Sequence, residues 1–186
     1  MQPVAEQAVA AFVAMRQIEG ARLRDDVLSR ADTIEQAVEQ IERRSPETVR
    51  EHMEKMQARR SGSVVNIGSM RGLDSPHFPF YPPAMGDQPV NYTTEKWAMI
   101  GLTKYMAGRY GKHHIRVNCI APGGFNPGLS DDPERKSFVD TYIANCPLGC
   151  WANEDDIKGP IVFLASEAAN YVTGATIVMD GGWTIW

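Results

Sequence analysis

The stretch SVVNIGS at residues 63–69 is a short β-branched run that ends in a glycine and a serine. A run of this length and composition is typical of a strand buried in a parallel sheet. Residues 115–120 and 176–179 read as two further strands, and residues 92–111 and 154–165 read as helices between them. This alternation predicts an α/β fold with right-handed crossovers, in which helices flank a parallel sheet of three strands.

The carboxyl ends of the predicted strands carry the candidate functional residues, as is usual in such sheets. Ser69 ends one strand, and the turn at residues 122–124 ends the next. Tyr92 and Lys96 are four residues apart on the predicted helix, so both project from one face and the ammonium favours the ionised phenol. Tyr92 is therefore a candidate general acid or base, and Ser69 a candidate donor to the same substrate oxygen. Taken alone, Y-x-x-x-K also fits an exposed pair on a helix surface.

The first sixty residues differ in composition from the rest. Residues 4–60 contain one glycine, Gly20, and are dense in Glu, Arg, Gln and Ala. Apolar residues fall at helical spacings there, namely Leu23, Val27, Ala31, Ile34, Val38 and Ile41. Ser45-Pro46-Glu47 predicts the start of a second helix. We expect two domains: residues 1–60 as a helical arm, either a hairpin or two helices that pack on something else, and residues 61–186 as the α/β part.

Composition and charge exclude several classes of protein. The chain is 43% hydrophobic and 23% charged, which is typical of a globular protein, and its net charge of −4 argues against a nucleic-acid partner. No signal peptide or membrane-spanning run is present, so a cytoplasmic protein is expected. Three cysteines (Cys119, Cys146 and Cys150) without C-x-x-C spacing predict reduced thiols, with Cys119 buried in a strand. His113-His114 reads as a surface turn, and no metal site is predicted.

A series of motifs in residues 61–186 resembles the short-chain dehydrogenase/reductase family. In order, these are Asn66-Ile67-Gly68-Ser69, Tyr92 to Lys96, Ile115-Arg116-Val117-Asn118, Pro122-Gly123-Gly124, Pro147-Leu148-Gly149, Phe163-Leu164-Ala165-Ser166, Tyr171-Val172-Thr173-Gly174 and Asp180-Gly181-Gly182. The resemblance is to the C-terminal catalytic half of the family, and it implies a partial, Rossmann-like sheet.

The resemblance also implies an activity, a cofactor and the residues that serve it. The activity is hydride transfer between NAD or NADP and an alcohol or carbonyl substrate. Ser69, Tyr92 and Lys96 would be catalytic, Tyr92 and Lys96 would also contact the cofactor, and Pro122, Gly123, Gly124 and Phe125 would border the nicotinamide. Residues 126–147 correspond to the substrate lid, where Asp131, Asp132 and Glu134 suit a polyol or sugar-type substrate. The family also implies a homo-oligomer, formed through the Tyr92 helix and the C-terminal strand. Independently of the resemblance, Trp183 and Trp186 are large aromatic residues at the C-terminal end of the sequence, which predicts packing at a subunit interface or, as the alternative, a substrate wall.

The family's dinucleotide-binding turn has no counterpart in the sequence. No G-x-x-x-G-x-G occurs, so residues 61–186 read as a truncated catalytic half with an incomplete cofactor site, and an inactive protein is one alternative. A fusion remnant that acts as a non-enzymatic oligomerisation module is a second. Residues 10–55 resemble the C-terminal region of YicC-like endoribonucleases on the pattern M-R-x-x-E-G-x-x-L-x-x-D, formed by Met15, Arg16, Glu19, Gly20, Leu23 and Asp26. An RNA-cleaving module is therefore a third alternative.

Overall fold

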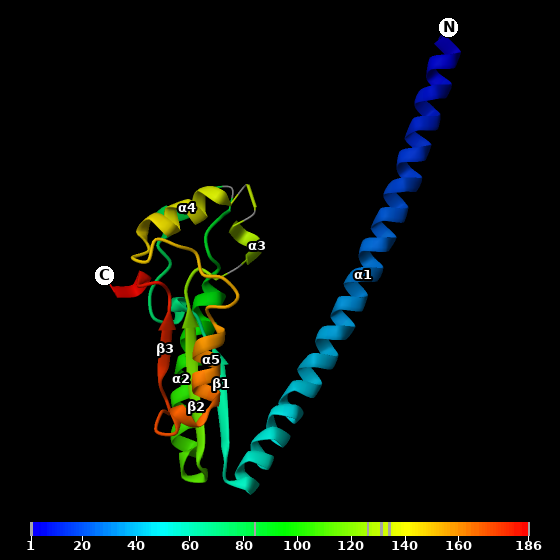
Figure 1. The fold of residues 1–186 in the computed structure, drawn as a ribbon. Helices are drawn as coiled ribbons and strands as arrows, with labels where there is room; N and C mark the ends of the chain where they lie inside the picture. The colour runs from blue at the N-terminus through cyan, green and yellow to red at the C-terminus, as the bar shows by residue number, and fades with distance from the viewer. Residues whose placement is uncertain (1, 84, 126, 131, 134, 186) are drawn as a thin grey trace. The chain divides into compact units, whose positions relative to one another are not determined.

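The computed structural model describes residues 2–83, 85–125, 127–130, 132–133 and 135–185 (Figure 1). The chain divides into two compact units, Met1–Glu54 and Lys55–Trp186. The first unit is helical and the second contains the sheet.

The N-terminal arm is one continuous helix, α1, Gln2–Arg59, so the predicted hairpin is wrong. Pro46 lies inside this helix and does not end it. No glycine lies between Gly20 and Gly62 to offer the left-handed backbone that commonly closes a helix, and the residues around Pro46 are good helix formers. Of the predicted apolar row, Leu23 is 66% exposed, and the side chains of Val27, Ala31, Ile34, Val38 and Ile41 lie outside the described set.

The sheet has three parallel strands in the order β1-β2-β3. They are β1, Gly62–Ile67; β2, Ile115–Pro122; and β3, Thr176–Met179. β2 is the middle strand and is buried along almost its whole length, with Cys119 fully inside. The predicted Rossmann-like sheet of three parallel strands is confirmed, and each predicted strand matches an observed one to within two residues.

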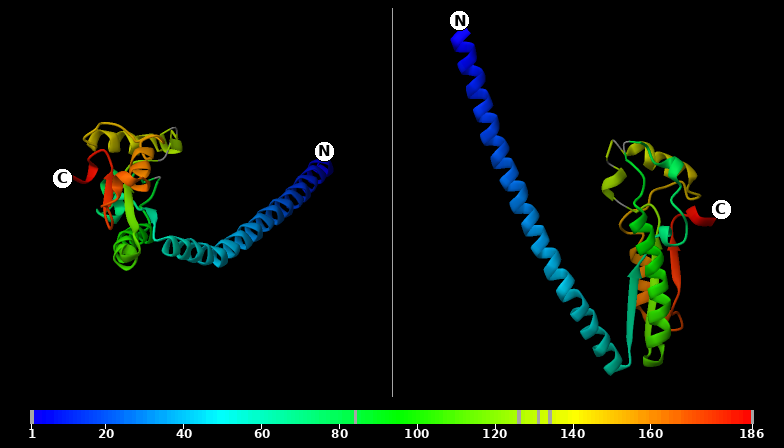
Figure 2. Two further views of the ribbon diagram at one scale, coloured as in Figure 1. Left: turned by 60° about the horizontal axis from the view of Figure 1, so that its bottom comes forward. Right: turned by 180° about the vertical axis from the view of Figure 1, so that it is seen from behind.

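Helices cover both faces of the sheet. α2, Val90–Tyr110, lies against one face, and α5, Lys158–Ala165, lies against the other, as the front and rear views show (Figures 1 and 2). Each strand is added on the same side of the one before it, in the order β1-β2-β3. Two crossovers that step in the same direction across a sheet but pass over its opposite faces must have opposite hands. In Figure 1 the chain passes behind the sheet through α2 and in front of it through α5, so the β1–α2–β2 crossover is right-handed and the connection from β2 to β3 is left-handed, which corrects the prediction for the second crossover. This second connection passes through α3 and α4 before it reaches α5, so it is not a compact βαβ unit.

The helix predicted at residues 154–165 begins later, at Lys158. Asn153 and Asp156 explain the difference because they bind the local backbone. The Asp155 N–H donates to Asn153 Oδ1 at 2.8 Å, and the Asn153 N–H donates to Asp156 Oδ2 at 2.8 Å. Side-chain bonds of this kind compete with helical hydrogen bonds, so residues 153–156 form a turn that leads into α5.

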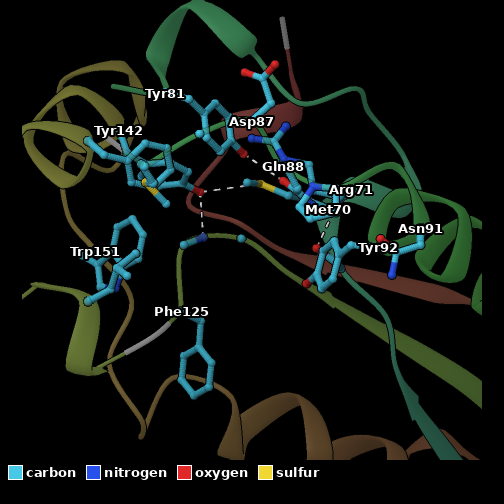
Figure 3. Close-up of a pocket in the computed structure, with 18 residues that line it drawn as sticks. Met70, Arg71, Tyr81, Asp87, Gln88, Asn91, Tyr92, Phe125, Tyr142 and Trp151 are labelled. Carbon is cyan, nitrogen blue, oxygen red and sulfur yellow. Dashed lines mark hydrogen bonds between the residues drawn. The ribbon is translucent and has the colours of Figure 1, made fainter. Parts of the chain in front are cut away.

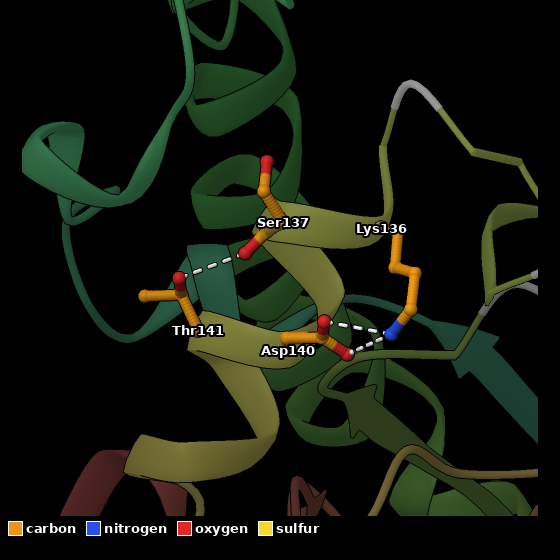
Figure 4. A network of polar contacts seen from close by, with 4 residues as sticks. All are labelled: Lys136, Ser137, Asp140 and Thr141. Carbon is orange, nitrogen blue, oxygen red and sulfur yellow. Dashed lines mark hydrogen bonds and ion pairs between the residues drawn. The ribbon is translucent and has the colours of Figure 1, made fainter.

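Two short helices lie beyond the carboxyl ends of the strands, α3, Pro127–Ser130, and α4, Lys136–Asn145. One side of α4 is exposed and carries an ion pair between Lys136 and Asp140, whose nearest N and O atoms are 2.7 Å apart (Figure 4). The other side buries Phe138, Val139 and Tyr142. The remaining short helices are of the 3-10 type and span Met70–Gly72, Phe78–Phe80, Gly111–His113, Glu167–Ala169 and Trp183–Ile185.

Two hydrophobic clusters hold these elements together. One, between the sheet and α5, is built on Ile120, Leu164 and Ala169. The other, beyond the strand ends, is built on Met70, Tyr142, Cys146 and Trp183. This second cluster positions the loops that surround the candidate site. None of the helices in the described residues is long and apolar enough to cross a membrane.

Candidate functional site

Ser69 lies directly beyond β1 and is 7% exposed. Its backbone is extended, and its hydroxyl oxygen accepts a hydrogen bond from the Arg71 N–H at 3.1 Å, which caps the Met70–Gly72 helix. The preceding residue is tied to β2, since the Gly68 N–H donates to the Ile120 carbonyl at 2.8 Å. These bonds fix the serine hydroxyl at the carboxyl edge of the sheet.

Tyr92 and Lys96 lie on the first two turns of α2. The Lys96 Nζ lies 5.4 Å from the centre of the Tyr92 ring and donates to the Ile67 carbonyl at 3.4 Å. Gly72 makes the close approach of the Ser69 turn to this helix possible. A Cβ at Gly72 would lie 2.4 Å from the Lys96 carbonyl oxygen, so only glycine fits without a shift of the backbone.

The turn that follows β2 is clamped by Tyr142 of α4. The Gly124 N–H donates to the Tyr142 hydroxyl at 2.8 Å. Gly123 packs on the residue that follows β3, where an added Cβ would lie 2.7 Å from the Asp180 Cα. The turn therefore has a single position, set by contacts with two segments that are distant in sequence.

Ser69, Tyr92 and the turn border one cavity of about 570 Å³ (Figure 3). Of the seven predicted site residues, five line it: Ser69, Tyr92, Gly123, Gly124 and Phe125. Lys96 and Pro122 do not line the cavity; Lys96 lies beside Tyr92, and Pro122 ends β2. The structure thus brings the predicted residues together at the strand ends, while their chemical roles stay predictions.

An aromatic cluster around Tyr142 forms another part of the cavity wall. The Tyr142 ring stacks on Trp183 with centroids 4.2 Å apart and meets Trp151 edge-on at 4.9 Å. Burial raises the pKa of Tyr142 to about 12, so its hydroxyl stays protonated at physiological pH. Trp183 is 7% exposed and stacks on Tyr142 without lining the cavity itself, so for this residue the structure supports neither the predicted subunit interface nor the predicted substrate wall. Trp186 lies outside the described residues.

Sequence reasoning missed several residues of the cavity wall. Arg71 is 4% exposed and lines the cavity beside Tyr81. The Tyr81 hydroxyl donates to Gln88 Oε1 at 2.8 Å, and burial raises the pKa of Tyr81 while the Arg71 charge opposes the rise. The position of Arg71 two residues after Ser69 was the available signal, because any cavity at this strand end must include the turn that follows.

The residues present fit the nicotinamide end of a dinucleotide. Lys96 holds a positive charge beside Tyr92, and residues 123–125 supply a backbone turn on the wall of the same cavity. The remainder of a dinucleotide would need a glycine-rich turn at a helix N-terminus, and the sequence contains no G-x-x-x-G-x-G. The fit is therefore partial.

Comparisons with known proteins agree with this arrangement. The family described as Enoyl-(Acyl carrier protein) reductase matches residues 9–184. The chain is 37% identical over 126 residues to 2-dehydro-3-deoxy-D-gluconate 5-dehydrogenase of Escherichia coli strain K12, covering 66% of this chain and 45% of that protein. It is 34% identical over 134 residues to galactitol 2-dehydrogenase (L-tagatose-forming) of Cereibacter sphaeroides, covering 70% and 49%.

A solved structure shows the same fold. A short-chain dehydrogenase from Leptospira borgpetersenii serovar Hardjo-bovis, with bound NAD+, matches with a TM-score of 0.62 and 34% identity, covering 75% of this chain and 50% of that one. The chain therefore spans about half the length of the relatives it matches. From these matches and the parallel sheet, we conclude that the chain belongs to the short-chain dehydrogenase/reductase family.

Proposed function

We propose that this protein is an NAD(P)-dependent oxidoreductase that acts on an alcohol or carbonyl group of a small polyol or sugar-type substrate. One observation carries the proposal: Ser69, Tyr92 and the turn at residues 123–125 border one cavity, with Lys96 beside Tyr92. The relatives named above, which act on a sugar acid and on galactitol, support the substrate class.

Tyr92 exchanges the proton in the proposed reaction. It is 39% exposed and its ring lines the cavity, so its hydroxyl can give a proton to a carbonyl oxygen or take one from an alcohol. Ser69 holds the same oxygen. Because the Ser69 oxygen accepts from the Arg71 N–H, its own hydrogen remains available to donate to the substrate. Lys96 keeps a positive charge next to the phenol and is anchored on the Ile67 carbonyl.

When bound, the nicotinamide supplies or accepts the hydride. Lys96 and residues 122–125 would hold its ribose and ring. Because the sequence has no glycine-rich phosphate-binding turn, we expect this chain alone to bind a free dinucleotide weakly. An inactive protein therefore remains the alternative outcome of the test.

We also propose that the protein forms a homo-oligomer. α2 exposes large apolar side chains, among them Trp97 (54% exposed), Leu102 (46%) and Tyr105 (65%), and α5 exposes Val162 (66%). Apolar area of this kind on two helices is commonly covered by a partner subunit. Light scattering after size-exclusion chromatography measures the mass; a monomer at micromolar concentration would contradict the proposal.

We propose the cytoplasm as the compartment, consistent with three free cysteines among the described residues.

The proposed activity is tested by titrating the purified protein with NADH and NADPH and following nicotinamide fluorescence. Saturable binding is expected, followed by turnover of galactitol or a sugar acid. Tyr92→Phe keeps the ring, so binding should persist while turnover falls by about a hundredfold or more. Tyr171→Phe, at a fully exposed tyrosine outside the cavity, is the control and should change neither. Absence of binding at millimolar cofactor would refute the enzyme proposal and favour the oligomerisation module.

A further inference from the structure

A buried cation borders the cavity that holds Ser69 and Tyr92. Arg71 is 4% exposed, and it is the one basic residue among the described residues that line this cavity. A guanidinium stays charged at any pH at which the protein is folded, and burying a charge is costly unless that charge is paired. The buried Arg71 charge is therefore expected to have a negatively charged partner.

The described residues hold Arg71 in place without neutralising it. Its Nη1 donates to the Ser75 carbonyl at 2.8 Å, and its guanidinium carbon lies 6.0 Å from the centre of the Trp183 ring. No ion pair joins it to a carboxylate within the part of the chain that the structure describes. Asp87 is the one acidic residue among the described lining residues, and Figure 3 shows its carboxylate pointing away from Tyr92.

The guanidinium keeps donors that face the cavity. It has five N–H donors, and its partners among the described residues are the Ser75 carbonyl, at 2.8 Å, and the Tyr81 side chain, which lines the same cavity. No fully buried side-chain nitrogen or oxygen in the described residues lacks a hydrogen-bond partner, so a guanidinium nitrogen without a partner there is not fully enclosed. Arg71 lines the cavity, so the cavity supplies the open space.

We propose that the Arg71 guanidinium binds a carboxylate of the substrate, which makes the substrate a hydroxy or keto acid. A guanidinium presents parallel N–H groups in a plane, which match the two oxygens of a carboxylate. The backbone N–H of Arg71 also donates a hydrogen bond to the Ser69 hydroxyl oxygen. One turn therefore carries both the guanidinium that would bind the carboxylate and the serine that would donate to the reacting oxygen. This inference rests on the proposed function, because it assigns the substrate class of the same cavity.

Isothermal titration calorimetry of the full chain with D-gluconate and with glucitol, with and without NAD+, tests the proposal. The two probes share a carbon skeleton and differ in the carboxylate. Gluconate should bind, and glucitol should bind about tenfold or more weakly, the difference that a charged hydrogen-bonded pair contributes. Equal affinity for the two probes, or no heat from gluconate under either condition, would overturn the proposal.

Variants of Arg71 test whether this residue causes the preference for gluconate over glucitol. Arg71→Met should weaken gluconate binding about tenfold or more and leave glucitol binding unchanged. Arg109→Met, an exposed arginine on α2, is the matched control. Arg71→Lys keeps the positive charge but lacks the paired N–H groups of the guanidinium, so its gluconate affinity should also fall. This variant replaces Arg71→Met in the test if circular dichroism shows that the methionine variant does not fold. Unchanged gluconate binding in a folded Arg71 variant would refute the assignment. Gluconate binding that depends on Arg71, without any cofactor binding, would refute the proposed function and the substrate assignment, and would leave Arg71 as a carboxylate-binding residue only.

Discussion

Replacing Tyr142 with phenylalanine isolates the hydroxyl that clamps the turn after β2. The variant keeps the ring stacked on Trp183 and loses the acceptor of the Gly124 N–H, which lies 2.8 Å away. A buried donor left without its partner costs about 1–3 kcal/mol, so we expect the free energy of unfolding to fall by about 1–2 kcal/mol because Gly124 is only partly buried. Urea denaturation followed by tryptophan fluorescence measures this change.

Tyr171→Phe is the matched control, because Tyr171 is fully exposed and its variant should stay within about 0.5 kcal/mol of the wild type. The pH dependence gives a second test. Burial raises the pKa of Tyr142 to about 12, above the value of about 10 in an unfolded chain. The folded state therefore holds this proton more tightly, and the resulting stability is complete below pH 10 and is lost as the pH rises from about 10 to 12.

Over that window the wild type should lose up to about 2–3 kcal/mol that the Tyr142→Phe variant does not lose, since each pKa unit corresponds to about 1.4 kcal/mol. The difference between the two proteins removes the contribution of the other tyrosines. A Tyr142→Phe variant as stable as Tyr171→Phe at pH 7, with the same loss above pH 10 as the wild type, would refute the reasoning.

Three further predictions follow from close contacts and burial. Gly72→Ala forces the Ser69 turn away from α2 and should lower stability by about 1–3 kcal/mol in urea titrations, whereas Gly101→Ala on the open side of α2 should stabilise or be neutral. Asn118→Ala removes bonds to the Val172 carbonyl (2.9 Å) and the Ala175 N–H (3.1 Å), and should lower the melting temperature by several degrees; an unchanged melting curve contradicts this. In thiol labelling at pH 7, exposed Cys150 should react first, and Cys119, whose pKa burial raises, only on unfolding; fast labelling of Cys119 contradicts its burial.

Most of the α/β unit was predictable because its signals are local. A strand shows in five or six residues, and the four-residue spacing of Tyr92 and Lys96 determines that they share a helix face. Parallel strands end at one edge of their sheet, so Ser69 and the turn after β2 were expected to meet, and both line the cavity. The structure confirms the three parallel strands and the buried position of Cys119.

The errors concern features that depend on distant contacts or on competing local bonds. Pro46 indicated a break, yet no glycine follows it before Gly62 and the described side chains at residues 44–52 are exposed, so α1 continues. The predicted hand of the second crossover failed because its helix is reached through α3 and α4. The division at residue 60 and the resemblance of residues 10–55 to YicC-like endoribonucleases stay predictions.

The sequence by itself determined the order of strands and helices and the residues that meet at the strand ends, because these depend on side-chain periodicity and on the geometry of a parallel sheet. Only the tertiary structure decided that Trp183 is internal, that Tyr142 clamps the turn at Gly124, and that Arg71 is buried with donors open to the cavity. Burial and hydrogen-bond satisfaction depend on which distant segments pack together, and no local pattern encodes that choice.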